Sequence, residues 1–406
     1  MIAGSLDPRY NEIIMSQSPI TPALLAPLVK QAQQALPQLR ADYQLPSGEK
    51  LPLYFAGLKG GQLRFGWFAR DLLTSALMLD DPVWLHSTAI FALETLGGEQ
   101  DAQTGEVPGR VIHEFNRVII RDQDTRYNAG DTTALLFVVL GRALRQGRMP
   151  FLEDYRPQLA LAAGYLCSCI QDGLYWEDPR RSGAERYALK STYWKDSWVP
   201  QRKDADPDYP VVYTLVQAQA VAALHAAARL AAAGWLTQDE LDFEALAQEL
   251  SQALWTNLWD EQTRFPLIAW DRRGPIPGLA SDGLHLLTYL ESSEVPPDKL
   301  AALAAGAASL ATNYGYRTYA PGQPDYDPES YHWGSIWPFD NFFIALGAKK
   351  HKLARIFKVA SSIANGLVQM GFTELWYDHN SHPIPVGSDL QLWSALAPQA
   401  LLRLIS

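Results

Sequence analysis

Cysteine is scarce in this sequence, with only Cys167 and Cys169 among 406 residues. The two stand two positions apart on a predicted helix, so their side chains point in different directions and make a poor disulfide. A reducing cytoplasm is therefore the expected compartment. The N-terminal stretch carries Asp7, Arg9 and Glu12 and contains no apolar run, so we expect no secretory signal peptide.

Long apolar runs and basic runs are also missing. No uncharged apolar run approaches the roughly 18 residues that a membrane-spanning helix requires, so we expect no membrane association. The chain carries 44 acidic and 34 basic residues, a net charge of −10. It lacks the clustered Lys and Arg that bind nucleic acid and anionic membrane surfaces, and we expect neither as a partner.

Metal-binding motifs are missing as well. His113 and Glu114 are not part of an HExxH pattern, and the eight histidines are scattered along the chain. A zinc motif of this kind needs two histidines on one face of a helix. We therefore expect no catalytic metal and no other cofactor.

Linkers and repeats are absent too. No Pro/Gly/Ser linker of useful length follows residue 60, and no segment recurs at a fixed period. We predict a single catalytic domain over residues 1–406, with residues 1–19 as an N-terminal arm. An α-solenoid, the alternative helical architecture, normally shows a repeat and is disfavoured.

Helical periodicity dominates what is present. Apolar residues at i, i+3 and i+4, and prolines near helix starts, predict an all-α chain. The twelve predicted helices are 20–43, 69–80, 83–96, 130–147, 153–171, 209–231, 238–258, 281–292, 296–313, 335–349, 350–370 and 389–404. The links after odd-numbered helices are long, at 44–68, 97–129, 172–208, 259–280, 314–334 and 371–388. This alternation predicts six helical hairpins closed into a ring, an (α/α)6 toroid, with the long loops around a funnel at one end. Residues 51–65 in the first loop suggest a short hairpin.

Aromatic residues are abundant, with 13 Trp and 18 Tyr, and flat rigid side chains suit packing against sugar rings. The segment Tyr193–Trp198 places Asp196 among large aromatics in a long loop. Loss of hydration there favours the neutral carboxyl, which would make Asp196 a proton donor near neutral pH. The alternative is a loop aspartate paired with Lys195 or Arg202.

Four further clusters fall in or beside the long loops. Their candidate ligand-binding residues, with Trp194 and Lys195 beside Asp196, are Trp67, Arg70, Asp71, His113, Glu114, Tyr127, Asp131, His332, Trp333, Trp337, Asp340, Gln391 and Trp393, and the last cluster also holds Glu374. Each has a structural alternative: Asp71 and Arg70 as a first-turn pair, Asp131 as an N-cap, Asp340 as a buried structural partner and Glu374 as a buried partner of an arginine. Five clusters on one rim together favour a ligand site.

At these residues the chain resembles the glucosidase domain of glycogen debranching enzymes and its relatives among processing α-glucosidases, glucoamylases and trehalases. Tyr331–Asn341 resembles the family's Tyr-His-Arg-Gly-Ser-Val-Trp-Pro-His-Asp-Asn, with Trp333 for the Arg and Phe339 for the His. Trp194–Ser197 resembles Gly-Trp-Lys-Asp-Ser, and Glu374–Ser394 is similar to the closing Pro-Glu-Leu…Gln-Ala-Trp-Ser. Gly105–Pro108 resembles Gly-Glu-Ile-Pro.

The resemblance implies an inverting, exo-acting hydrolase of a terminal α-glucosidic bond. Asp196 would protonate the leaving oxygen and Glu374 would deprotonate a water, with the two carboxyls roughly 6.5–9.5 Å apart. Arg70 and Asp71 would hold the sugar in the −1 position. Trp67, Trp194, Trp333 and Trp337 are candidates for stacking on it.

Two other classes stay open. A sugar epimerase or a polysaccharide lyase can use the same toroid, although His113 and His332 are the only rim histidines available as a pair. A carbohydrate-binding protein that has lost activity is the third class, since Trp333 and Phe339 depart from the family pattern. The aglycone is open among glycogen stubs, small malto-oligosaccharides and glycosylated compatible solutes, as is the oligomeric state.

Overall fold

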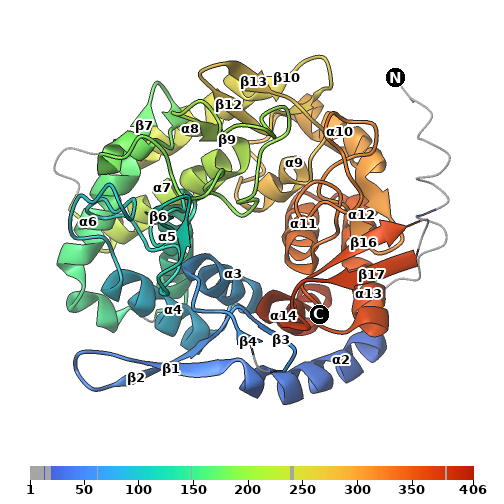
Figure 1. The fold of residues 1–406 in the computed structure, drawn as a ribbon, viewed down its shortest axis with the longest axis horizontal. Helices are drawn as coiled ribbons and strands as arrows, with labels where there is room; N and C mark the ends of the chain where they lie inside the picture. Colours follow the sequence, from blue (N-terminus) through green and yellow to red (C-terminus); the bar gives the residue numbers. More distant parts are fainter. Residues whose placement is uncertain (1–12, 14–19, 62, 148, 238–241, 380–381) are drawn as a thin grey trace.

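The computed structural model describes Ile13 and residues 20–61, 63–147, 149–237, 242–379 and 382–406. Apart from Ile13, the expected N-terminal arm lies outside this part of the chain. The described part is mainly helical, and its inner helices form a closed ring (Figure 1).

Within the described ranges, the inner ring consists of six helical segments. They are α3 (Ala69–Leu79), α5 (Thr132–Arg145), α7 (Thr214–Ala232), α9 (Asp282–His285) with the 3-10 turn η4 (Leu286–Thr288), α11 (Pro338–Lys350) and α14 (Leu392–Ile405). Each contacts the next, and α14 contacts α3. Every residue of α3 is buried, as expected for a helix that is covered on all sides.

The remaining helices lie outside this ring. They are α2 (Pro22–Ala35), α4 (Pro82–Glu94), α6 (Arg156–Ser168), α8 (Phe243–Asn257), α10 (Pro297–Gly306), α12 (Ala354–Ser361) and α13 (Ile363–Met370), with 3-10 turns η1 (Leu36–Gln38), η2 (Pro150–Glu153), η3 (Pro179–Ser182) and η5 (Ala307–Leu310). Helix α2 is amphipathic: it buries only Leu25, Leu28 and Ala32, which face α14 and the core. No helix of the described residues is both long and apolar enough to cross a membrane.

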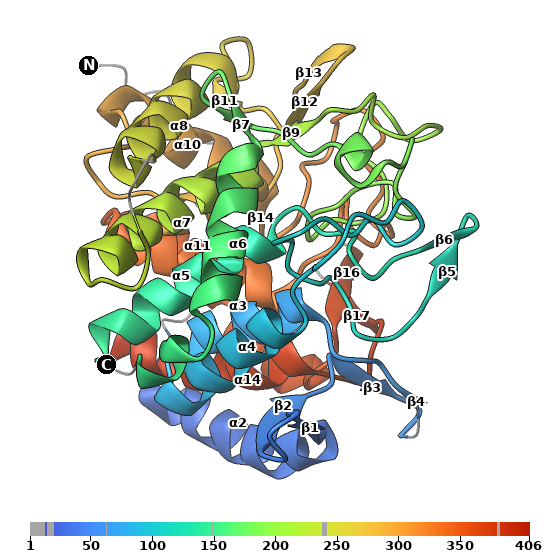
Figure 2. The same cartoon turned by 90° about the vertical axis from the view of Figure 1, so that its left-hand side faces the viewer.

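The long loops carry short antiparallel strands. These are β1 (Arg40–Gln44), β2 (Lys50–Tyr54), β3 (Gly57–Lys59), β4 (Leu63–Arg64), β5 (Ile119–Ile120), β6 (Gln123–Asp124), β7 (Ile170–Gln171), β8 (Leu174–Tyr175), β9 (Val212–Tyr213), β10 (Trp259–Asp260), β11 (Phe265–Pro266), β12 (Ala269–Asp271), β13 (Gly274–Ile276), β14 (Ala311–Thr312), β15 (Gly315–Tyr316), β16 (Leu375–His379), β17 (His382–Val386) and β18 (Leu390–Gln391). Figure 2 shows many of these loops extending from one end of the ring, as the alternation of link lengths predicted.

The ring closes where the beginning of the chain meets its end. Strand β18 pairs with β3, with Leu390 opposite Leu58 and Gln391 opposite Gly57. Helix α14 lies between α3 and α2 (Figure 1). This junction, which we call the seam, joins residues more than 300 positions apart.

The expectation of a mainly helical chain is confirmed for the described residues, with local corrections. The helix expected at 20–43 ends at Ala35, and Arg40–Gln44 forms β1 with β2 as its partner. The helix expected at 350–370 is divided into α12 and α13 at Ser362. The helix expected at 209–231 begins only at Thr214, because Val212–Tyr213 pairs with β12.

Candidate active site

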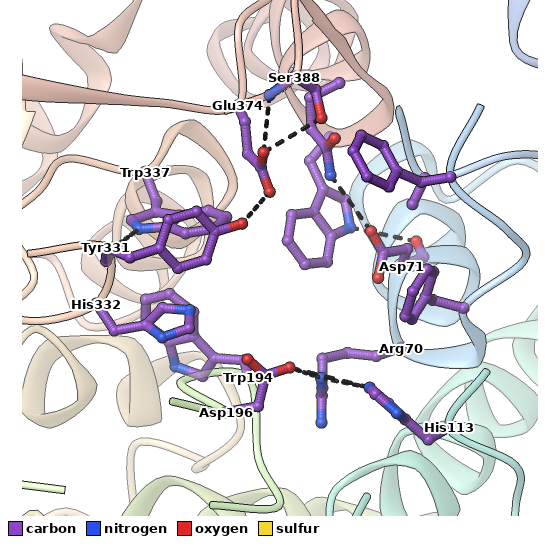
Figure 3. A pocket seen from close by; sticks show the side chains of 15 residues that line it. Arg70, Asp71, His113, Trp194, Asp196, Tyr331, His332, Trp337, Glu374 and Ser388 are labelled. Carbon is purple, nitrogen blue, oxygen red and sulfur yellow. Dashed lines mark hydrogen bonds and ion pairs between the residues drawn. The ribbon is translucent and has the colours of Figure 1, made fainter. Parts of the chain in front are cut away.

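A cavity of about 230 Å³ opens at the end of the ring where the inner helices begin. Its lining residues are Ala56, Phe65, Phe68, Arg70, Asp71, His113, Trp194, Asp196, Tyr331, His332, Trp337, Glu374, Ser388, Gln391 and Trp393. Segments from the whole length of the chain therefore meet in one site. Asp196 and Glu374 lie on opposite sides of it (Figure 3).

Asp196 points into the cavity beside Arg70 and His113. Its Oδ2 is 3.4 Å from Nη1 of Arg70 and 3.9 Å from Nε2 of His113. Although 32% of the side chain is exposed to the cavity, desolvation by the surrounding protein raises the pKa of Asp196 to about 6. The Arg70 charge opposes this rise, while Asp131 and Glu374 add to it.

Lys195 and Arg202, the two cations that could have paired with Asp196, are paired with other acids. Nζ of Lys195 lies 3.0 Å from Asp282, and Nε of Arg202 lies 2.8 Å from Asp271. Asp196 is therefore held at the cavity wall by neither of these cations.

Arg70 is fixed from behind by Asp131. Its Nε donates to Oδ2 of Asp131 at 2.7 Å, and both side chains are buried. Asp131 precedes α5 but makes no side-chain capping bond among the described residues. The N-cap alternative for Asp131 is thus replaced by a buried ion pair that orients Arg70 towards Asp196.

Glu374 has three hydrogen-bond donors around its carboxylate. The Tyr331 hydroxyl donates to Oε1, and the Ser388 backbone N–H and hydroxyl lie 2.8 and 3.2 Å from Oε2. Gly387, with φ of 83°, lies so close that a Cβ there would collide with the Glu374 carboxylate. Within the described residues Glu374 thus bonds to a tyrosine and a serine rather than to the arginine of the alternative reading.

Asp71 lies in the first turn of α3 and lines the same cavity as Glu374. Its Oδ1 accepts from Nε2 of Gln391 at 3.4 Å. Burial raises the pKa of Asp71 well above its usual range, Glu374 and Asp196 add to the rise, and Arg70 opposes it. Trp393 donates to Oγ1 of Thr74 at 2.7 Å and so ties α14 to α3 at the cavity wall.

An aromatic wall faces these acids. His332 stacks on Trp337 with ring centroids 5.5 Å apart, and Trp194 meets Trp337 edge-on at 5.7 Å. Burial is the main cause that lowers the pKa of His332 well below its usual range, and Lys195 and Arg70 add to it. The pKa of His113 is shifted in the same direction by burial and by Arg70. Both imidazoles are therefore neutral near pH 7.

Several residues expected at the site support it from behind and are not among the lining residues. Trp67 packs in an aromatic cluster with Tyr43, Phe91 and Phe115. Trp333 is fully buried and donates from Nε1 to the backbone oxygen of Trp198 at 2.6 Å. Neither indole is placed to stack on a sugar in the cavity.

The expected polar residues outside the wall have internal partners. Lys195 bonds to Asp282, Tyr127 donates to the Thr95 carbonyl at 3.3 Å, and Asp340 accepts from His285 at 2.8 Å. Asp340 is thus a buried structural partner, as the alternative interpretation of this residue predicted. Glu114 accepts from Thr125, and burial raises the pKa of Glu114 to about 7.

The structure adds lining residues that were not selected from the sequence: Ala56, Phe65, Phe68, Tyr331 and Ser388. Tyr331 directly precedes His332 in the Tyr331–Asn341 cluster, so the sequence contained a signal for it. Ser388 and Ala56 had none, because a small residue in a loop carries no periodicity. Among the described residues, no group of three or more His, Cys, Asp and Glu side chains is arranged to hold a metal ion.

The fold is shared with solved glycoside hydrolases. The mannosylglycerate hydrolase of Thermus thermophilus, solved with Tris and D-glycerate, superposes with a TM-score of 0.65 at 16% identity, covering 92% of this chain and 99% of that one. Its complex with glucose gives the same values. A rhamnosidase from Klebsiella oxytoca with rhamnose bound superposes with a TM-score of 0.57 at 13% identity, over 95% of this chain and 65% of that one.

The class of protein that the family match shows is a glycoside hydrolase. A family model described as the mannosylglycerate hydrolase MGH1-like glycoside hydrolase domain matches residues 102–394, and the chain belongs to that family. The expected class is thereby confirmed, while the match is to the MGH1-like domain and not to the glucosidase domain of debranching enzymes. The search of curated proteins gave no match.

Proposed function

We propose that the protein is an inverting, exo-acting glycoside hydrolase on an (α/α)6 toroid, with Asp196 as general acid and Glu374 as general base. The observation that carries the proposal is the placement of these two carboxylates on opposite sides of one cavity in unlike surroundings (Figure 3). Inverting hydrolysis needs such a pair with room for a water between them.

The surroundings of the two carboxylates suit these separate roles. Asp196, with a pKa raised to about 6, keeps up to about that pH a proton that it can give to the leaving oxygen. Glu374 is oriented by the Tyr331 hydroxyl and by Ser388, so its carboxylate is aimed at a water on the opposite face of the sugar. Arg70, Asp71 and Gln391 supply donors and acceptors for the hydroxyls of the ring between them.

The size of the cavity supports removal of one terminal sugar. Its volume of about 230 Å³ lies below the roughly 300–1,000 Å³ of pockets that enclose drug-sized ligands. A single hexose with a small aglycone suits this space better than an internal segment of a polysaccharide.

The proposed substrate is a small α-glucoside. The family description and the D-glycerate and glucose complexes of the Thermus enzyme favour a small hydroxy acid as its aglycone, and they make the corresponding α-mannoside the second candidate. A panel of α-glucosylglycerate, α-mannosylglycerate, maltose and isomaltose separates these possibilities. Family membership also favours hydrolysis over the epimerase and lyase alternatives, and turnover of any member of the panel rules out a lapsed enzyme.

The first sugar released from an α-glycoside is expected to be the β-anomer. Attack of a water activated by Glu374, from the face opposite to the departing group, inverts the anomeric carbon. Proton NMR in the first minutes of the reaction, before mutarotation, measures the anomer directly. Release of the α-anomer would contradict the inverting mechanism.

Activity is expected to fall as the pH rises through about 6. Asp196 must be protonated to act, and its pKa in the free protein is raised to about 6, so the alkaline limb of kcat/KM reports its deprotonation. A profile of kcat/KM between about pH 4 and about pH 9 measures that limb. Rates that keep rising above about pH 7 would exclude Asp196 as the acid.

A further inference from the structure

The segment that carries Asp196 is tied to the inner ring by one buried carboxylate, Asp282. Asp282 is the first residue of α9 and is almost wholly buried. Its Oδ1 accepts from Nε1 of Trp194 at 2.9 Å, and its Oδ2 accepts from the Tyr193 hydroxyl at 3.1 Å and from Nζ of Lys195 at 3.0 Å. The three residues immediately before Asp196 thus share a single anchor.

Lys195 supplies the charge that makes this anchor strong. Its ammonium group is fully buried and lies 4.9 and 4.7 Å from the ring centroids of Trp194 and Trp333. It also donates to the carbonyl of Thr318 at 3.1 Å. A buried ammonium of this kind needs a counter-charge, and Asp282 is the carboxylate that it contacts.

The residues after Asp196 are held as well. Oγ of Ser197 lies 2.9 Å from Nδ1 of His332, and the Trp198 carbonyl accepts from Trp333. Every neighbour of Asp196 in the segment 193–198 is therefore bonded to another element, while Asp196 itself faces the cavity. An irregular loop needs such fixing, because a displacement of about 1 Å at a catalytic group can cost about 10²-fold in rate.

We propose that Asp282 is a positioning residue for general-acid catalysis: by binding Tyr193, Trp194 and Lys195 it sets the place of the Asp196 carboxyl. The inference rests on the proposed role of Asp196 as the acid. Asp282 does not line the cavity, so it acts on the substrate only through the segment that it anchors.

The competing explanation is that Asp282 only stabilises the fold. The chain offers a matched control in Asp271, another buried carboxylate that binds the same long loop. Asp271 binds Arg202 through two bonds of 2.8 and 3.0 Å, and Arg202 lies six positions after Asp196. The variants D282N and D271N thus loosen the same loop at two places, of which only one adjoins the acid.

The test compares two substrates that differ in their need for an acid. The alcohol part of an alkyl α-glycoside leaves as an alkoxide unless its oxygen is protonated, whereas the fluoride of an α-glycosyl fluoride departs with little assistance. D282N is expected to lower kcat on the alkyl glycoside by about 10²-fold and on the fluoride by less than about 3-fold. D271N is expected to change both rates by the same factor. Equal losses on both substrates in D282N would overturn the inference.

Two further variants separate the possible failures. D196N is expected to lose activity on the alkyl glycoside and retain it on the fluoride, and equal losses there would refute the proposed acid itself. The expected split in D196N without one in D282N would refute only the positioning role. If D282N does not fold, Y193F removes a single bond to Asp282 and is expected to show a smaller loss with the same dependence on the leaving group. Equal rates of Y193F and wild type on both substrates would then count against the inference.

Discussion

Replacing Glu374 with glutamine is expected to lower kcat by about 10³- to 10⁴-fold on alkyl glycosides and glycosyl fluorides alike, because both reactions need an activated water. An amide keeps the shape of the side chain and still accepts a bond from Tyr331 or Ser388, but it cannot take the proton of the water. The rate is measured by sugar release under saturating substrate. A loss of this size on both substrates contrasts with the selective loss expected for D196N.

The control is a variant that changes a contact of the Glu374 carboxylate and keeps the carboxylate itself. S388A removes one hydroxyl contact of 3.2 Å and leaves the shorter backbone bond of 2.8 Å in place, so its kcat should fall by less than about 10-fold. Both variants should keep the melting temperature within a few degrees of the wild type. If E374Q retained more than a tenth of the wild-type rate, Glu374 would not be the base.

Replacing Arg70 with glutamine is expected to have the largest effect on stability together with a loss of activity. The change leaves Asp131 buried without its cation, a loss that typically costs about 3–5 kcal/mol of unfolding free energy. It also removes the charge that holds down the pKa of Asp196, so the alkaline limb of the pH profile should move to higher pH. Denaturant unfolding and the pH profile of residual activity measure the two effects.

The double variant R70Q/D131N distinguishes a charge effect from a packing effect. With both charges removed, much of the lost stability should return, because the buried anion is no longer unpaired. Activity should not return, since Arg70 also faces Asp196 and the sugar site. A double variant as unstable as R70Q would show that the ion pair is not the source of the cost.

Periodicity in the sequence was sufficient to place most helices. The expected ranges 69–80, 83–96 and 130–147 agree with α3, α4 and α5 within about three residues, because apolar spacing marks their extent and a proline or an acidic residue marks each start. The failures occur where tertiary pairing decides. Arg40–Gln44 alternates polar and apolar residues over only five positions, which is too short a run to separate it from the preceding helix, and it is a strand because β2 pairs with it.

The site was predictable as a set of clusters and less so residue by residue. The loops identify Asp196, Glu374, Arg70 and Asp71, because charged groups among aromatics are unusual there. They do not show which way a side chain points. Trp333 and Lys195 stand next to lining residues in the sequence yet face inwards, and a loop without a period gives no signal for that choice.

The seam passes directly behind the proposed sugar site. Gln391 and Trp393 contact Asp71 and Thr74 across 320 and 319 positions of sequence, so this wall of the cavity exists only after the two ends of the ring have met. Contacts between such distant residues form late and slowly in folding, since the entropy of closing the chain must be overcome first. We therefore expect the proposed activity of a refolding chain to appear no earlier than the closure of the seam.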